Sequence, residues 1–111
     1  TPQVVIIYQT PPPLKEITDA EIISYQTRAT FQWRTSESSN AKVKIYDEFG
    51  FSAELQSMNK FFHATEFLNL GSFHWYKFII TPTDLDGNGY KEVSGKFQTT
   101  QFSYQSTNME L

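Results

Sequence analysis

Two histidines are the residues of this 111-residue sequence best suited to acid–base chemistry, and there is no cysteine. A catalytic nucleophile needs a base within hydrogen-bond reach and a group that orients the base. His63 stands at an inward position among apolar neighbours and His74 in a loop, so we predict a hydrogen-bonded packing histidine and a solvent-exposed one. No serine elbow, phosphate-binding glycine loop or paired-histidine motif accompanies them. The sequence therefore predicts a protein that is not an enzyme and needs no cofactor.

One acidic segment resembles the first half of a calcium-binding loop. Asp84, Asp86 and Asn88 alternate around Gly87, and a hard cation requires several such oxygen ligands. The complete loop has a glutamate at its twelfth position, where this sequence has Gly95. Asp, Asn and Gly are also typical of tight hairpin turns. We expect a turn here, with calcium binding as the alternative.

The composition argues against several classes of function. The net charge of -3 and the pI near 5.3 disfavour a nucleic-acid-binding protein, which needs a basic excess. No apolar run reaches the roughly 18–20 residues of a membrane span, so we expect no membrane insertion. The chain has the length of one domain, and 39% of its residues are hydrophobic. It can therefore bury a single core.

Alternation of apolar and polar residues predicts strands with one solvent-exposed face. The predicted strands are 17–24, 28–35, 41–46, 51–55, 61–70, 73–83 and 92–100. Polar residues 36–40 and the glycine-rich residues 86–89 are expected to form turns. Seven short strands without a helix predict an antiparallel sandwich. Its core would contain Ala29, Phe31, Trp33, Val43, Ile45, Phe67, Leu70, Tyr76, Phe78, Ile80 and Phe97.

Three stretches resemble a fibronectin type III domain of the kind common in microbial surface proteins. Residues 28–35 resemble the family's second strand, whose tryptophan is Trp33 here. Leu70 and Tyr76 resemble its tyrosine corner, although Ser72 stands where the family often has proline. Residues 84–88 and 97–100 resemble its last hairpin and strand. The resemblance implies a seven-stranded immunoglobulin-like sandwich in an extracellular or cell-surface protein.

The two ends of the chain extend beyond this resemblance. We divide the chain into an N-terminal strand-like extension with a proline linker (1–13), a fibronectin type III-like domain (14–100) and a C-terminal extension (101–111). The prolines at 11–13 cannot donate backbone hydrogen bonds and so separate the first run from the domain. That run could add a strand to the sheet edge of a neighbouring chain. Alternatively, it could pair within its own domain or be the tail of a preceding module. It consists of Val4, Val5, Ile6, Ile7 and Tyr8.

The outward residues of the predicted strands include several lysines. They predict either a docking surface for an acidic partner or an anionic polymer, or a solvated face that resists aggregation. This candidate face contains Lys42, Lys44, Tyr46, Lys77, Ile79 and Lys96. Sugar rings could stack on aromatic residues that we expect to be exposed, namely Trp75, Phe61, Phe62 and Tyr90.

Together these features predict a non-catalytic structural or interaction module of an exported or cell-surface protein. The most concrete mechanism is assembly into a filament or sheath by strand addition through residues 4–8. The partners would be other protein chains or neighbouring domains, including copies of this chain. The alternative is an accessory carbohydrate-binding module or a spacer, which calcium could stiffen, within a larger extracellular protein.

Overall fold

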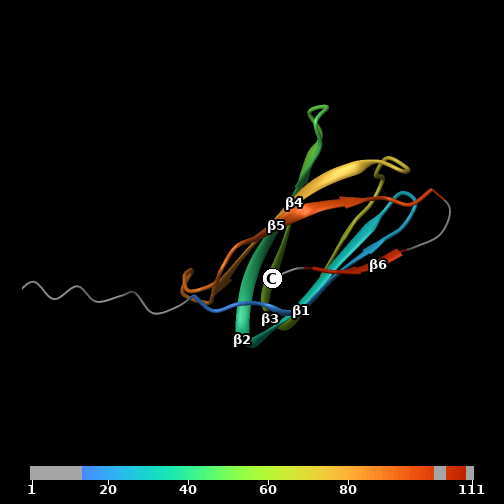
Figure 1. Ribbon diagram of the computed structural model, residues 1–111. Coiled ribbons are helices and arrows are strands. Elements are labelled where there is room, and N and C mark those ends of the chain that lie inside the picture. The colour runs from blue at the N-terminus through green and yellow to red at the C-terminus, as the bar shows by residue number, and fades with distance from the viewer. Residues whose placement is uncertain (1–13, 102–104, 110–111) are drawn as a thin grey trace, which may run out of the picture.

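A computed structural model describes residues 14–101 and 105–109, and in these residues the protein is all-β (Figure 1). The run Val4–Tyr8 lies outside the described residues. The described part contains no helix that is long and apolar enough to cross a membrane. The prediction of an antiparallel all-β fold is confirmed. The strands are β1 (Thr18–Ser24), β2 (Ala29–Tyr46), β3 (Ser52–Phe67), β4 (Trp75–Asp84), β5 (Val93–Gln98) and β6 (Gln105–Asn108).

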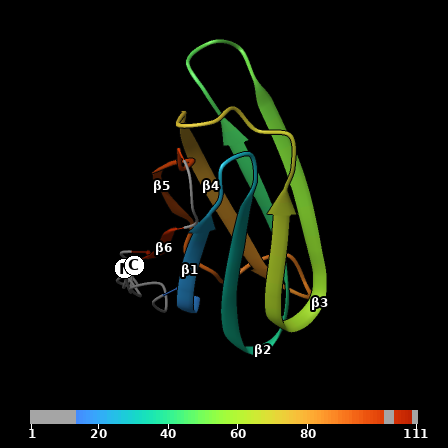
Figure 2. The same ribbon diagram turned by 90° about the vertical axis from the view of Figure 1, so that its right-hand side faces the viewer.

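The six strands form one sheet that curls because β2 changes partners along its length. The sheet order is β5-β4-β2-β1-β6, and β3 pairs with β2. The first part of β2, residues 29–34, pairs with β1, whereas its second part, residues 39–46, pairs with β4. The long strands β2 and β3 run side by side, as Figure 2 shows. The curl brings β4 and β5 opposite the first part of β2.

Residues 36–40 were predicted to form a turn, and this prediction is wrong. They lie within β2, where the pairing with β3 shifts register between Arg34 and Ser39 and again between Ser39 and Ala41. Such bulges bend a strand without ending its ladder. The segments 51–55 and 61–70, predicted as separate strands, likewise belong to a single strand, β3, which begins at Ser52 and ends at Phe67. The seven predicted strands thus become five, and β6, which was not predicted as a strand, brings the number in the described residues to six.

The core lies inside the curl, and all eleven residues predicted for it are buried. Phe31 is central, with its ring centroid 5.3 Å from those of Phe78 and Phe97 and 5.7 Å from that of Phe67. Tyr90, expected to be exposed, is buried instead and belongs to the core cluster, and Lys15 pairs with it in an isolated parallel bridge. The core also contains residues the sequence analysis did not name: Ile17, Ala20, Ile22, Ala41 and Val93.

The segment after residue 100 returns to the sheet. β6 pairs antiparallel with β1, from Glu21 opposite Asn108 to Ser24 opposite Gln105. Beyond the strand, the Met109 N–H donates to the Ala20 carbonyl oxygen at 3.0 Å. The outer edge of β1 is thus covered by the chain's own C-terminal extension.

A buried polar network occupies the bend in β2. His63 is fully buried, as its predicted packing role requires, with Nε2 2.9 Å from Ser39 Oγ and Nδ1 2.6 Å from Ser57 Oγ. Ser39 Oγ is also 2.7 Å from Thr35 Oγ1, which donates to the Glu37 carbonyl oxygen. Ser39 Oγ also donates to the Lys60 carbonyl oxygen at 3.3 Å. In one assignment, Ser57 donates to Nδ1 and Nε2–H donates to Ser39. This assignment requires a neutral imidazole.

We expect acid to destabilise the fold through His63. Burial lowers the pKa of His63 below its ordinary value of 6.5. The folded state therefore favours the neutral ring, and its contribution to stability is complete above pH 6.5 and is lost as the pH falls below it. One proton sets an upper limit of about 1.4 kcal/mol per pH unit on this slope.

Urea unfolding between pH 8 and pH 5 measures this slope. The control is His74→Gln, which should keep the loss on the acid side because His63 is unchanged. Equal unfolding free energies at pH 7.5 and pH 5 in both proteins would contradict the role assigned to His63.

Candidate functional site

Strand register places the six residues of the predicted docking face together, and we call them the lysine face. On β4, Lys77 lies opposite Lys96 of β5 and Tyr46 of β2. One step along, Ile79 lies opposite Lys44, and Lys42 follows opposite Thr81. All four lysines are exposed. Three neighbouring strands thus present one continuous outer surface.

The lysine face is locally basic although the chain carries a net charge of -3. In β2 to β5, the acidic residue that shares this surface is Glu54, which lies opposite Lys44. Lys77 and Lys96 are direct cross-strand neighbours. Like charges in this position repel and destabilise a sheet.

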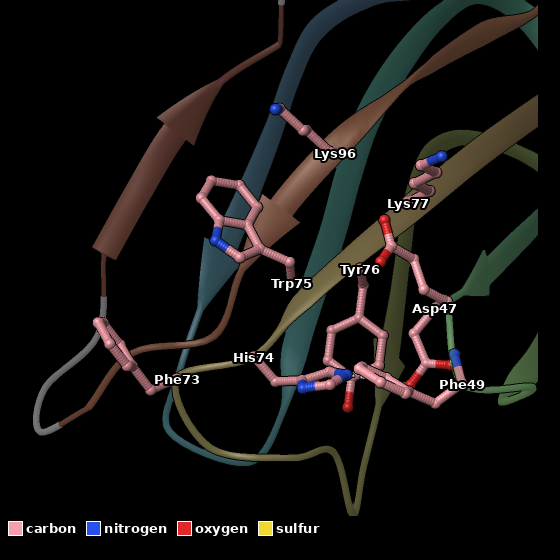
Figure 3. A pocket seen from close by; sticks show the side chains of 9 residues that line it. Asp47, Phe49, Phe73, His74, Trp75, Tyr76, Lys77 and Lys96 are labelled. Atoms are coloured by element: carbon pink, nitrogen blue, oxygen red, sulfur yellow. Dashed lines mark hydrogen bonds and ion pairs between the residues drawn. The ribbon is translucent and has the colours of Figure 1, made fainter.

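A pocket of about 440 Å³ opens at one end of the lysine face (Figure 3). Figure 3 shows Trp75 and Phe73 on one side, Phe49 on the other, and His74 and Tyr76 between them. The sequence analysis named Trp75, Lys77 and Lys96 separately but did not find the pocket, because its lining comes from segments far apart in the chain. The lining residues are Asp47, Glu48, Phe49, Phe73, His74, Trp75, Tyr76, Lys77 and Lys96.

Three aromatic side chains of the pocket remain largely in solvent. Phe49 is 80% exposed, Phe73 59% and Trp75 54%. The Lys96 ammonium lies 5.2 Å from the Trp75 ring centroid, within cation–π range. The Phe49 ring lies 5.7 Å from the His74 ring. Exposed aromatic residues that cluster around a concave surface are typical of a binding site.

The segment before β4 is fixed by hydrogen bonds that hold the aromatic rings in place. The Gly71 N–H donates to the Tyr76 hydroxyl at 2.7 Å, which is the geometry of a tyrosine corner. A side chain on Gly71 would lie 3.3 Å from that hydroxyl, so glycine permits the approach. The buried Thr99 hydroxyl accepts from the His74 N–H at 2.9 Å and donates to the Gly71 carbonyl at 2.5 Å.

Phe73 has a backbone φ of +50°, in the left-handed region that bulky residues rarely adopt. Its N–H donates to the Thr100 carbonyl oxygen at 3.3 Å. A residue in this conformation costs of order 1–3 kcal/mol and persists where the surrounding structure imposes it. The chain therefore accepts strain at the residue that presents an exposed aromatic ring to the pocket.

The opposite side of the pocket is a turn organised by Asp47. Its Oδ1 accepts from the N–H groups of Phe49 and Phe51, each at 2.9 Å, and its Oδ2 lies 3.0 Å from His74 Nε2. Burial acts to raise the pKa of Asp47, but these hydrogen bonds outweigh it, so the pKa lies below its ordinary value. His74 was expected to be exposed, but it is half-buried because this pairing holds it.

The other predicted site residues lie away from the pocket. Phe61 and Phe62 are exposed on β3, where Arg34 lies over the Phe62 ring at 5.4 Å. The Asp84 Oδ1 accepts from the N–H groups of Asp86 and Asn88 at 2.9 and 3.1 Å, which makes this segment a tight turn. Within residues 14–101 and 105–109, no three His, Cys, Asp or Glu residues are grouped so that they could hold a metal ion.

Comparison with known proteins does not identify the chain. No protein-family model matches it, and no curated protein does either. Its function must therefore be inferred from the geometry of its own residues.

Removing the Tyr76 hydroxyl should loosen the segment that carries the pocket. Tyr76→Phe leaves the Gly71 N–H without its acceptor and should lower the unfolding free energy by about 1 kcal/mol. Chemical denaturation measures this loss. Tyr46→Phe, on the lysine face, is the control and should change stability by less than about 0.5 kcal/mol. An equal effect of both substitutions would show that the corner hydrogen bond contributes nothing.

Proposed function

We propose that the curled sheet is a fibronectin type III-like sandwich. Two observations support this. The bulge region divides β2 into a part that pairs with β1 and a part that pairs with β4, and its register shifts divide the pairing of β3 with β2 into two stretches, so β1 to β5 supply seven paired segments. The hydrogen bond between Gly71 and Tyr76 lies where the family resemblance predicts a tyrosine corner.

On this scaffold we propose a non-catalytic interaction module that binds an anionic partner through the lysine face. The observation that carries the proposal is the pair Lys77 and Lys96. This pair lies directly opposite across two strands, so it costs stability in the free protein. A partner that brings negative charge would relieve the repulsion. A setting in an exported or cell-surface protein follows from the family resemblance.

Two further observations favour binding over catalysis. The Ser39–His63 pair has the spacing of a nucleophile and its base, but both residues are fully buried, so a substrate cannot reach them. In the pocket, the His74–Asp47 pair is accessible and could orient a base. The hydroxyl that lines the pocket, however, is that of Tyr76, and it already accepts a hydrogen bond from the Gly71 N–H.

Removing charge from the lysine face should weaken binding and increase the stability of the free protein. Lys77→Gln removes the repulsion with Lys96 and should raise the unfolding free energy by roughly 0.2–1 kcal/mol. The triple substitution Lys44→Gln, Lys77→Gln and Lys96→Gln should abolish retention on polyglutamate and polygalacturonate resins at low salt, because the attraction is electrostatic.

The matched control keeps the same net charge. Lys15→Gln, Lys60→Gln and Lys91→Gln remove three lysines that lie off the face, and this protein should be retained like the wild type. Absence of retention of the wild type on both resins, or equal loss in the two triple variants, would contradict the proposal.

A second candidate function is assembly by strand addition, and the pairing of β3 favours it. Among the described strands, β3 pairs with β2 alone, so the other edge of this 16-residue strand is open. An open edge presents unpaired backbone N–H and C=O groups that an added strand can satisfy. The donor would be residues 4–8 of a neighbouring copy.

Light scattering across a concentration series, with and without residues 1–10, tests the assembly. We expect large assemblies that dissociate to folded monomers when these residues are removed. A monomer in both forms would rule out strand addition and leave the lysine face as the interaction surface.

A further inference from the structure

We propose that the pocket beside the lysine face binds a sugar ring of an acidic polysaccharide, with the lysines pairing to its carboxylates. This inference rests on the proposed function, since it names the partner class of the lysine face. It follows from the position of the pocket, the chemistry of its lining and the charge around it.

The pocket has the size and the surfaces that a sugar ring requires. Its volume of about 440 Å³ lies within the range of roughly 300–1,000 Å³ that is usual for small-molecule sites. The faces of aromatic rings are electron-rich, so they attract the polarised C–H groups on the flat face of a pyranose. Trp75 and Phe73 lie on one side of the pocket and Phe49 on the other (Figure 3), and each ring has such a face. These rings are exposed, so the core does not account for their presence.

The lysines that continue from the pocket along the face favour an acidic sugar over a neutral one, whereas the lining itself balances Lys77 and Lys96 with Asp47 and Glu48. Of the two carboxylates, that of Asp47 is occupied by two backbone N–H groups and by His74, which leaves Glu48. Lys77 and Lys96 line the same pocket, and Lys44 and Lys42 continue the positive charge along the face. The lysine that lies over Trp75 can pair with a carboxylate on a ring stacked there. A chain of uronic acid residues would thus satisfy both the rings and the lysines.

Other anionic polymers match fewer of these features. An acidic polypeptide would pair with the lysines, but its carboxylate side chains offer no flat apolar face to the aromatic rings. A single-stranded nucleic acid could stack on the rings, but such sites are built in strongly basic proteins, and this chain is acidic overall. Neither of its two arginines lies on the face, because Arg28 pairs with Glu66 and Arg34 lies over Phe62.

The two tryptophans give a direct readout of the pocket. Trp33 is fully buried and Trp75 is 54% exposed, so acrylamide quenching of the wild-type protein reports on Trp75. Hexagalacturonate should protect this fluorescence. The fully methyl-esterified hexamer has the same rings without charge and should bind at least tenfold more weakly, as should hexaglutamate and a dT6 oligonucleotide.

Calorimetry on variants separates the pocket from the rest of the face. Trp75→Ala and Lys96→Gln should each weaken hexagalacturonate binding at least tenfold. Phe61→Ala and Lys60→Gln, which change an aromatic and a lysine on β3, should stay within threefold of the wild type. Phe73→Asn should weaken binding without lowering the melting temperature, because asparagine tolerates the left-handed backbone.

Each contrary result overturns the inference in a distinguishable way. Equal binding of hexaglutamate or dT6, with no effect of Trp75→Ala, would leave a lysine face that binds polyanions but would remove the sugar site. Equal binding of the methyl ester would show that the charge of the sugar is irrelevant. Failure of every saccharide to bind, while the protein is still retained on polyglutamate resin, would refute the pocket and spare the proposed function.

Discussion

The bend of β2 is the constraint on which the rest of the structure depends. Between Arg34 and Ala41 the strand shifts register twice and passes from the part of the sheet that contains β1 to the part that contains β4. The bend buries the Ser39 hydroxyl, and a buried polar group without a partner would cost about 1–3 kcal/mol. His63 supplies that partner, and its ring stacks on Trp33 with centroids 5.1 Å apart and planes 9° apart. Polar pairing and aromatic packing therefore fix the bend together.

The position of the bend decides what the outer surface can present. It brings β4 and β5 over Phe31, so Phe78 and Phe97 must point inward to reach that ring. Because side chains alternate along a strand, Lys77 and Lys96 must then point outward, at positions where the core makes no demand. The packing of the core therefore does not determine which residue types stand at positions 77 and 96. The same core thus supplies a rigid support for a surface whose chemistry is independent of it.

Much of the fold could be predicted from the sequence, because alternation is a local signal. It identified the inward residues of β2 and β4 and hence the lysine face. It failed at residues 36–40, where polar residues resemble a turn and the burial of Ser39 depends on His63, 24 residues away. The pocket could not be predicted for the same reason, because it forms where the Asp47 turn meets His74, 27 residues along the chain. Pairings over such distances leave no periodic trace in one sequence.

Under the proposed function, the lysine face and the pocket act over different distances, which would explain why they lie together. Charges attract a polymer from up to about one Debye length, roughly 8 Å at physiological ionic strength, but they discriminate little between anions. Contacts with Trp75 and Phe73 act only at van der Waals distance, where the shape of the ligand decides. On a chain with a net charge of -3, a basic face also orients the approach, because the rest of the surface repels an anion. In the binding that we propose, a ligand drawn to Lys77 and Lys96 would therefore reach the rings that can distinguish it.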